Sequence, residues 1–368
     1  MLSVLPPLYP DELLYSLYAR YKRWLGYDSD SSVFADLFCE VGRCRSRLAS
    51  IDHDHADLFF KNVPRTWARS HERIITDYTM RRYFTAFEFH LDADGDAIDA
   101  EFSKYSKMRR LPSNGVVRTT VLGYCTECLV NDCRQFGEPY WHRSHQLRGV
   151  FVCSKHGVFL EYHQVQRRSN GVELAWPPWP DPEKLQQSEP VDYLNPEHQL
   201  LMCIATDSSW LLTHGLGRTQ RDNIRTFYAV ALQRPYAHRF YDPLFRATFS
   251  REFLTAVGLY VSGGRRTTVG KTWRSLSTST LAHILVFYAL GLNFRAVFLE
   301  EALGTVLKHL SIQRSSWVLD RASHGIDKRQ PLPIERIVGL GVTTQLCLTS
   351  AVKKRFDNLN IQLSEICT

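Results

Sequence analysis

The most informative segment of the sequence runs from Tyr124 to Gly157 and reads YCTECLVNDCRQFGEPYWHRSHQLRGVFVCSKHG. It contains two Cys-x2-Cys/His pairs with 24 residues between them. Two such pairs, each bending around an ion through a tight turn, are the usual way in which a chain offers four ligands tetrahedrally to zinc. A glycine directly after the second pair allows the backbone to turn sharply there. The spacing predicts one structural Zn²⁺ ion, bound by Cys125, Cys128, Cys153 and His156.

Three further residues between the pairs are alternative ligands: Cys133, His142 and His145. Whether any of them touches the metal stays open at this stage. A site closed by four protein ligands leaves no coordination position for water, so a catalytic zinc is disfavoured. His142 and His145 are three residues apart, and we interpret them as packing or hydrogen-bonding groups. Trp141 beside them is expected to anchor a small core.

The composition is that of a globular protein. The 368 residues allow two or three domains, with 44% hydrophobic and 23% charged residues. The longest apolar run, Leu281 to Leu292, is too short to span a bilayer, so no membrane association is expected. The first seven residues lack the basic and apolar regions of a signal peptide. We therefore expect a cytoplasmic protein with reduced cysteines.

The charge balance favours a polyanionic partner. The chain has 45 basic and 38 acidic residues, a formal net charge of +7, and 34 of the basic residues are arginine. Arginine pairs well with phosphate groups and guanine edges. A GC-rich genome enriches arginine in every protein, and this explains the number of arginines equally well.

The chain divides into three segments, which together predict a mainly α fold. Residues 1–110 are expected to form a helical, helix-turn-helix-like module, and residues 111–187 a zinc-binding knuckle or ribbon insert that ends in a proline-rich linker. Residues 188–368 are expected to form a C-terminal helical module. Apolar spacing places helices at 10–25, 31–42, 56–61, 67–77, 80–89, 197–212, 220–232, 251–257, 281–290 and 294–303, and strand-like runs at 149–152 and 158–162.

No catalytic pattern is found in the sequence. A phosphate-binding loop, a Gly-x-Ser-x-Gly elbow, a His-Glu-x2-His zinc motif and a dinucleotide fingerprint are all missing. The acidic turn at Asp92–Asp96 lacks the glycine and glutamate of an EF-hand, so it is interpreted as a solvated turn. We therefore predict that the protein is not an enzyme.

Basic residues cluster at three places, and their spacing lets several guanidinium groups reach one phosphate backbone. A solvated charged face is the alternative for each cluster. The residues expected to bind nucleic acid are Arg109, Arg110, Arg218, Arg221, Arg225, Arg265 and Arg266.

Several motifs in order along the chain resemble the TniQ/TnsD family of transposon target-selection proteins. They are Pro10-Asp11-Glu12-Leu13-Leu14-Tyr15-Ser16 with Arg20, Tyr124-Cys125-x2-Cys128, Tyr140-Trp141-x3-His145-Gln146-Leu147-x-Gly149-Val150, and Cys153-x2-His156-Gly157. The second half resembles TnsD through Arg251-Glu252-Phe253-Leu254, Gly258, Trp273, Leu276, His283 and Ile284. Arg148 replaces a proline that is common in the family, and no second cysteine pair follows His156, so a single zinc site is expected.

The resemblance implies an adaptor that works on DNA in the cytoplasm. Such proteins mark an insertion site by binding target DNA directly or through a CRISPR guide-RNA complex, and they recruit an AAA+ ATPase (TnsC-like) that brings in the transposase. The resemblance places the ATPase contact around Glu12, Arg20 and Lys22.

Two other functions stay as alternatives. One is a zinc-containing transcription regulator, and the other is a metallo-hydrolase that uses His142 or His145. The sequence leaves three questions open. They are whether DNA is recognised directly or through a guide complex, which DNA sequence is recognised, and whether the protein is a monomer or an oligomer such as a homodimer.

Overall fold

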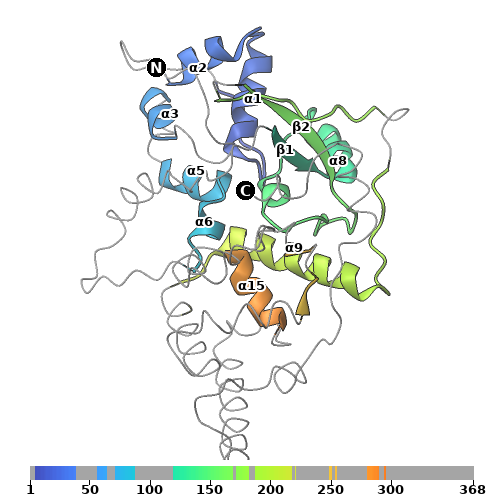
Figure 1. Cartoon of the computed structure of the whole chain (residues 1–368). Coiled ribbons are helices and arrows are strands. Elements are labelled where there is room, and N and C mark those ends of the chain that lie inside the picture. Colours follow the sequence, from blue (N-terminus) through green and yellow to red (C-terminus); the bar gives the residue numbers. More distant parts are fainter. Residues whose placement is uncertain are drawn as a thin grey trace, which may run out of the picture.

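The computed structural model describes residues 5–38, 56–63, 71–87, 119–168, 171–181, 187–217, 220, 248–250, 253–254, 280–289 and 294–295. This part is mainly helical, as predicted, with one small antiparallel sheet (Figure 1). Within the described residues, no helix combines the length and the hydrophobicity needed to cross a lipid bilayer.

The other N-terminal helices lie to one side of α1 (Leu14–Trp24), whose side chains are buried from Leu14 to Tyr21 (Figure 1). The helix ends where Gly26 adopts a positive φ of 68°, a conformation that favours glycine. Four helices follow at or near the predicted positions: α2 (Asp30–Phe38), α3 (Ala56–Asn62), α5 (His71–Tyr78) and α6 (Arg81–Phe84). The apolar periodicity therefore located this group of helices correctly.

The small sheet lies beside α1 (Figure 1). Strand β1 (Thr119–Tyr124) pairs antiparallel with β2 (Glu161–Arg168), in a register that places Tyr124 opposite Glu161. A two-residue strand, β3 (Gly171–Val172), pairs with the end of β2. The strand prediction for 149–152 is wrong, because only Val152 forms a bridge there, to Phe159, across the tight turn between them. The strand prediction for 158–162 is partly confirmed, because β2 begins at Glu161.

The sequence between the two Cys/His pairs contains a helix that was not predicted. Helix α8 (Thr126–Phe136) follows β1 directly and ends at Gly137, which has a φ of 81°. A short 3-10 helix, η1 (Arg143–Gln146), comes next. The buried face of α8 includes Cys128 and Asp132 as well as Leu129. Because a polar and a thiol side chain replace apolar ones on this face, the apolar periodicity is weak.

Two helices from the C-terminal part of the chain lie below the N-terminal helices and the sheet in Figure 1. Helix α9 (Pro196–His214) contacts α6, η1 and α15 (Thr280–Ala289). The side chain of Asn195 caps α9 by accepting a hydrogen bond from the Glu197 N–H at 2.9 Å. Nearly every residue of α15 is buried, so the described part of the long apolar run, residues 281–289, forms a core helix. The helices predicted at 220–232, 251–257 and 294–303 lie largely or entirely outside the described residues.

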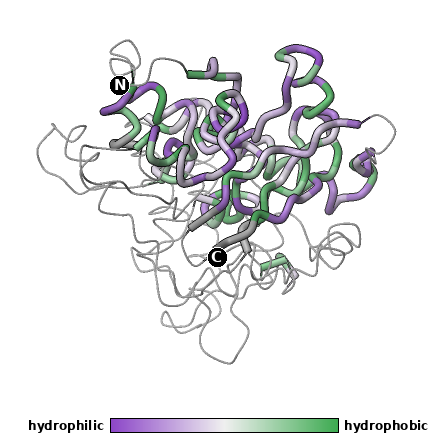
Figure 2. Tube along the Cα trace, turned by 90° about the horizontal axis from the view of Figure 1, so that it is seen from above, coloured by the Kyte–Doolittle hydropathy of each residue, from purple (hydrophilic) through white to green (hydrophobic). Residues whose placement is uncertain are grey.

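Hydrogen bonds tie the N-terminal helices to the segment between the Cys/His pairs. The Leu13 N–H donates to the Trp141 carbonyl at 2.9 Å, and the Arg143 N–H donates to the Asp11 carbonyl at 2.9 Å. Trp141 is completely buried at this junction, as expected of an anchor residue. In Figure 2, hydrophobic and hydrophilic stretches alternate along the described part of the chain.

The proline-rich segment near residue 177 has no helix or strand, and part of it lies against α1. The Ala175 N–H donates to the Tyr15 hydroxyl at 2.8 Å, and the Leu174 N–H donates to the Asp30 carboxylate at 3.0 Å. The indole N–H of Trp141 donates to the Ala175 carbonyl at 2.8 Å. Residues 173–181 are therefore an extended strap on the N-terminal helices.

Candidate metal centre

The four residues singled out by their spacing converge at one point. Cys125 is the residue before α8, and Cys128 lies in the first turn of that helix. Cys153 and His156 occupy a tight turn, closed by a 2.9 Å hydrogen bond from the Gly157 N–H to the Cys153 carbonyl. Three of the four side chains are buried, and their ligand atoms all lie within 4.8 Å of one another, so the group could hold a metal ion.

The distances between the ligand atoms fit a tetrahedral zinc ion. Bond lengths of about 2.3 Å for sulfur and about 2.0 Å for nitrogen give tetrahedron edges of about 3.8 Å between sulfurs and about 3.5 Å between sulfur and nitrogen. The Sγ atoms of Cys128 and Cys153 are 3.8 Å apart. The Nδ1 atom of His156 lies 3.4 Å, 3.3 Å and 3.6 Å from the sulfurs of Cys125, Cys128 and Cys153.

The electrostatics of the cluster also favour a bound cation. Without one, contacts with the thiols of Cys125 and Cys153, together with burial, raise the pKa of Cys128. Three adjacent buried thiols cannot all lose their protons unless a positive charge compensates them. A divalent metal supplies that charge and deprotonates a coordinating thiol outright. The N-terminus of α8 adds a partial positive charge beside Cys125 and Cys128.

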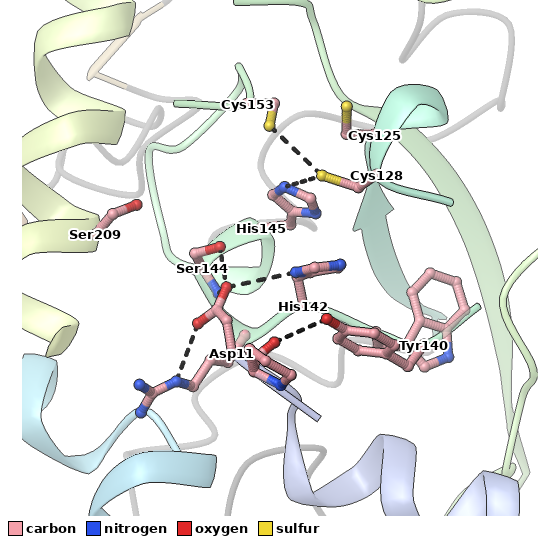
Figure 3. A network of polar contacts seen from close by, with 12 residues as sticks. Asp11, Cys125, Cys128, Tyr140, His142, Ser144, His145, Cys153 and Ser209 are labelled. Atoms are coloured by element: carbon pink, nitrogen blue, oxygen red, sulfur yellow. Dashed lines mark hydrogen bonds and ion pairs between the residues drawn. The ribbon is translucent and has the colours of Figure 1, made fainter. Parts of the chain in front are cut away.

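Two further side chains, those of His145 and Asn131, lie next to the four potential ligands. The Nε2 atom of His145 is 4.0 Å from the Cys128 sulfur, as Figure 3 shows, while its Nδ1 atom is buried without a hydrogen-bond partner. The carboxamide nitrogen of Asn131 lies 3.1 Å from Nε2 of His156. If Nδ1 of His156 binds metal, Nε2 carries the proton, and a flipped Asn131 carboxamide provides its acceptor. Cys133 is half-buried and outside the cluster.

Residues 3–160 match the TniQ family. The chain contains a TniQ domain. This match confirms the resemblance of the motifs between Pro10 and Gly157, and it connects the protein in general terms with target-site selection in transposition. It does not reach the motifs between Arg251 and Ile284, so their resemblance to TnsD stays a prediction. A comparison with curated proteins finds no match.

His142 of the TniQ domain takes part in a separate polar network (Figure 3). Its Nε2 atom is 2.9 Å from the Asp132 carboxylate, and its Nδ1 atom is 3.7 Å from the Asp11 carboxylate. Although burial lowers the pKa of His142, its hydrogen bonds to Asp11 and Asp132 raise it to about 9. His142 is thus a buried cation between two carboxylates, and both ring nitrogens are engaged away from the cysteines.

Asp11 joins this network to the rest of the domain. Its carboxylate accepts hydrogen bonds from the Arg143 guanidinium at 3.1 Å and from the Ser144 hydroxyl at 2.5 Å (Figure 3). Asp11 has a φ of 56°, which is uncommon for a residue other than glycine. Sequence reasoning missed this network, and the only available signal was the Pro10-Asp11-Glu12 motif itself.

Two of the three residues expected to contact a partner are inside the TniQ domain. Glu12 and Arg20 have no exposed surface and form an ion pair at 2.9 Å. Arg20 also pairs with Glu138 at 2.7 Å. Their expected role as direct contacts is therefore corrected, because side chains buried in an ion-pair network are not accessible to a partner. Lys22 is partly exposed and pairs with Asp30 at 2.7 Å.

The expected nucleic-acid contacts cannot be placed in the fold. All seven lie outside the described residues: Arg109, Arg110, Arg218, Arg221, Arg225, Arg265 and Arg266. The acidic turn at Asp92–Asp96 also lies outside them.

Proposed function

We propose that this protein marks the insertion site of a transposon and recruits an AAA+ ATPase (TnsC-like) that brings in the transposase. The observation that supports this most directly is the TniQ match over residues 3–160, which spans both the N-terminal helices and the Cys/His cluster. The role requires binding surfaces and no catalytic group. It would be performed in the cytoplasm, on chromosomal DNA.

Within this proposal the Cys/His cluster holds one structural Zn²⁺ ion. Three thiolates and one imidazole are a donor set that zinc prefers, and four protein ligands leave no place for a reactive water. The ion would fix the start of α8 against the turn at Cys153 and His156. His142 is held by Asp11 and Asp132, so the metallo-hydrolase alternative loses one of its two candidate histidines.

Metal content tests this part of the proposal. Wild-type protein is expected to contain one zinc per chain by elemental analysis. Cys128→Ser should lose the metal and become sensitive to limited proteolysis within 119–168. Cys133→Ser is the matched control, because Cys133 lies on the same helix but outside the cluster. Equal zinc content in the two variants would refute the assignment.

For target recognition we propose direct binding of DNA through the seven arginines named above, with a CRISPR guide-RNA complex as the second route. Purified protein is incubated with randomised duplex DNA at about 150 mM salt, where nonspecific phosphate contacts are weak, and retained DNA is sequenced. Enrichment of one extended motif supports direct recognition. Retention without enrichment supports the guide-dependent route. Charge reversal at three of the last five arginines should abolish either form of binding.

Recruitment of the ATPase separates this proposal from a zinc-containing transcription regulator. The transposition adaptor should co-purify with an AAA+ ATPase from its own cells, whereas a transcription regulator needs no such partner. Failure of wild-type protein to bind that ATPase, with and without DNA, would contradict the proposed function.

A further inference from the structure

Exposed hydrophobic side chains lie at the C-terminal end of α1 and on the strap whose Trp179 ring the Arg23 guanidinium covers. Most large hydrophobic residues in the described part are buried, but Trp24, Leu25 and Trp179 each expose nearly half of their surface. Trp24 and Leu25 follow each other at the end of α1, and Trp179 belongs to the extended strap at residues 173–181. We call the surface formed by Arg23, Trp24, Leu25, Trp176 and Trp179 the tryptophan shelf. An exposed apolar patch of this kind is typical of a binding surface.

Arg23 gives the shelf a distinct charge. Its guanidinium carbon lies 4.7 Å from the ring centroid of Trp176 and 5.2 Å from that of Trp179. No carboxylate in the described part of the chain forms an ion pair with Arg23. This contrasts with Arg20 and Lys22 on the same helix, which are both paired. Stacking holds the planar guanidinium in place and leaves its N–H edge available to a carboxylate.

Both sides of the shelf are anchored to the core, so its shape exists before a partner binds. The indole N–H of Trp24 donates to the Glu138 carboxylate at 3.3 Å. The strap is fixed to the N-terminal helices by the hydrogen bonds of Leu174 and Ala175 described above. A preformed surface loses little conformational entropy on binding.

We propose that the tryptophan shelf binds a protein segment that carries a carboxylate next to a large apolar side chain. The carboxylate would pair with Arg23, and the apolar side chain would pack on Trp24, Leu25 and Trp179. Tryptophan and arginine are the residues that most often dominate such contacts. Nucleic acid fits less well, because the shelf has one unpaired cation and is flanked by the Glu138 carboxylate. Resting on the proposed function, the segment would belong to the recruited ATPase.

A displayed library of random 12-residue peptides, selected on the full-length protein, tests this inference. Wild-type protein should enrich peptides in which Asp or Glu adjoins Trp, Phe or Leu. Trp24→Ala should weaken binding of an enriched peptide about thirtyfold. Arg23→Glu should change the selected flanking charge from acidic to basic. Leu194→Ser is the matched control, since Leu194 is 90% exposed elsewhere on the surface.

Several results would overturn the inference. One is that Arg23→Glu and wild type enrich the same peptides. Another is that wild type captures a labelled single-stranded oligonucleotide in preference to peptides, and that this capture depends on Trp24. Dimerisation of wild type that Trp24→Ala abolishes, seen by light scattering, would show a second copy as the occupant. If the shelf variants still co-purify with the ATPase, the shelf assignment fails and the proposed function stands. If wild type binds acidic peptides but no ATPase, the proposed function fails and the shelf stands.

Discussion

Replacing His142 by glutamine should change how the stability of the protein depends on pH. In the folded protein the pKa of His142 is raised from 6.5 to about 9 by hydrogen bonds to Asp11 and Asp132, which outweigh the effect of burial. This difference corresponds to about 3 kcal/mol of folding free energy. Because the folded pKa exceeds the unfolded one, this stabilisation is fully present below pH 6.5. It is lost as the pH rises through 9.

The assay is urea unfolding of the metal-loaded protein and of His142→Gln at several pH values between 6 and 10. The difference in unfolding free energy should be largest near pH 6 and should shrink by about 3 kcal/mol toward pH 10. His163→Gln is the control, since burial lowers the pKa of His163 and its contribution must have the opposite slope. A difference between wild type and His142→Gln that is constant across this range would refute the assignment of His142 as a buried cation.

Three further predictions concern the TniQ domain. Arg20→Met should destabilise the fold by about 3–5 kcal/mol in urea unfolding, because it leaves Glu12 buried without its partner, and adding Glu12→Gln should recover part of this loss. Gly157→Ala should be destabilising, because Gly157 has a φ of 64° that favours glycine and the new Cβ would also meet the Tyr193 hydroxyl; Tyr193→Phe should therefore restore only part of the melting temperature. His145→Ala should retain zinc but release it to a chelator with about tenfold lower apparent affinity, and unchanged affinity would show that His145 does not support the thiolates.

Local patterns predicted much of the fold and the four residues of the candidate metal centre. The spacing of Cys125, Cys128, Cys153 and His156 is informative because each pair is closed by one tight turn, and a turn is a short-range feature. Helices α1, α9 and α15 were found because their apolar residues recur with helical spacing. The division at residues 110 and 187 and the helix-turn-helix likeness stay predictions.

The buried charges could not be predicted in the same way. Charged side chains are seldom fully buried unless they are paired. Glu12 and Arg20 were expected at a partner contact from the family resemblance alone, whereas the structure buries them as an ion pair. Their partner Glu138 is more than 110 residues away in the sequence. Asp11, Asp132 and His142 likewise meet only in the folded chain. Pairing of this kind depends on tertiary structure, which a single sequence does not encode in any local pattern.

Helix α8 connects the candidate metal centre to the tryptophan shelf. Cys125 and Cys128 lie at its start, and Glu138 follows directly after its end. Glu138 holds Arg20 at 2.7 Å and accepts a hydrogen bond from Trp24 at 3.3 Å, so the end of α8 is fixed to the helix that carries the shelf. An ion bound by Cys125 and Cys128 at one end of α8 would therefore restrain the position of the other end. In this way the proposed structural Zn²⁺ would stiffen the proposed binding surface without taking part in any reaction.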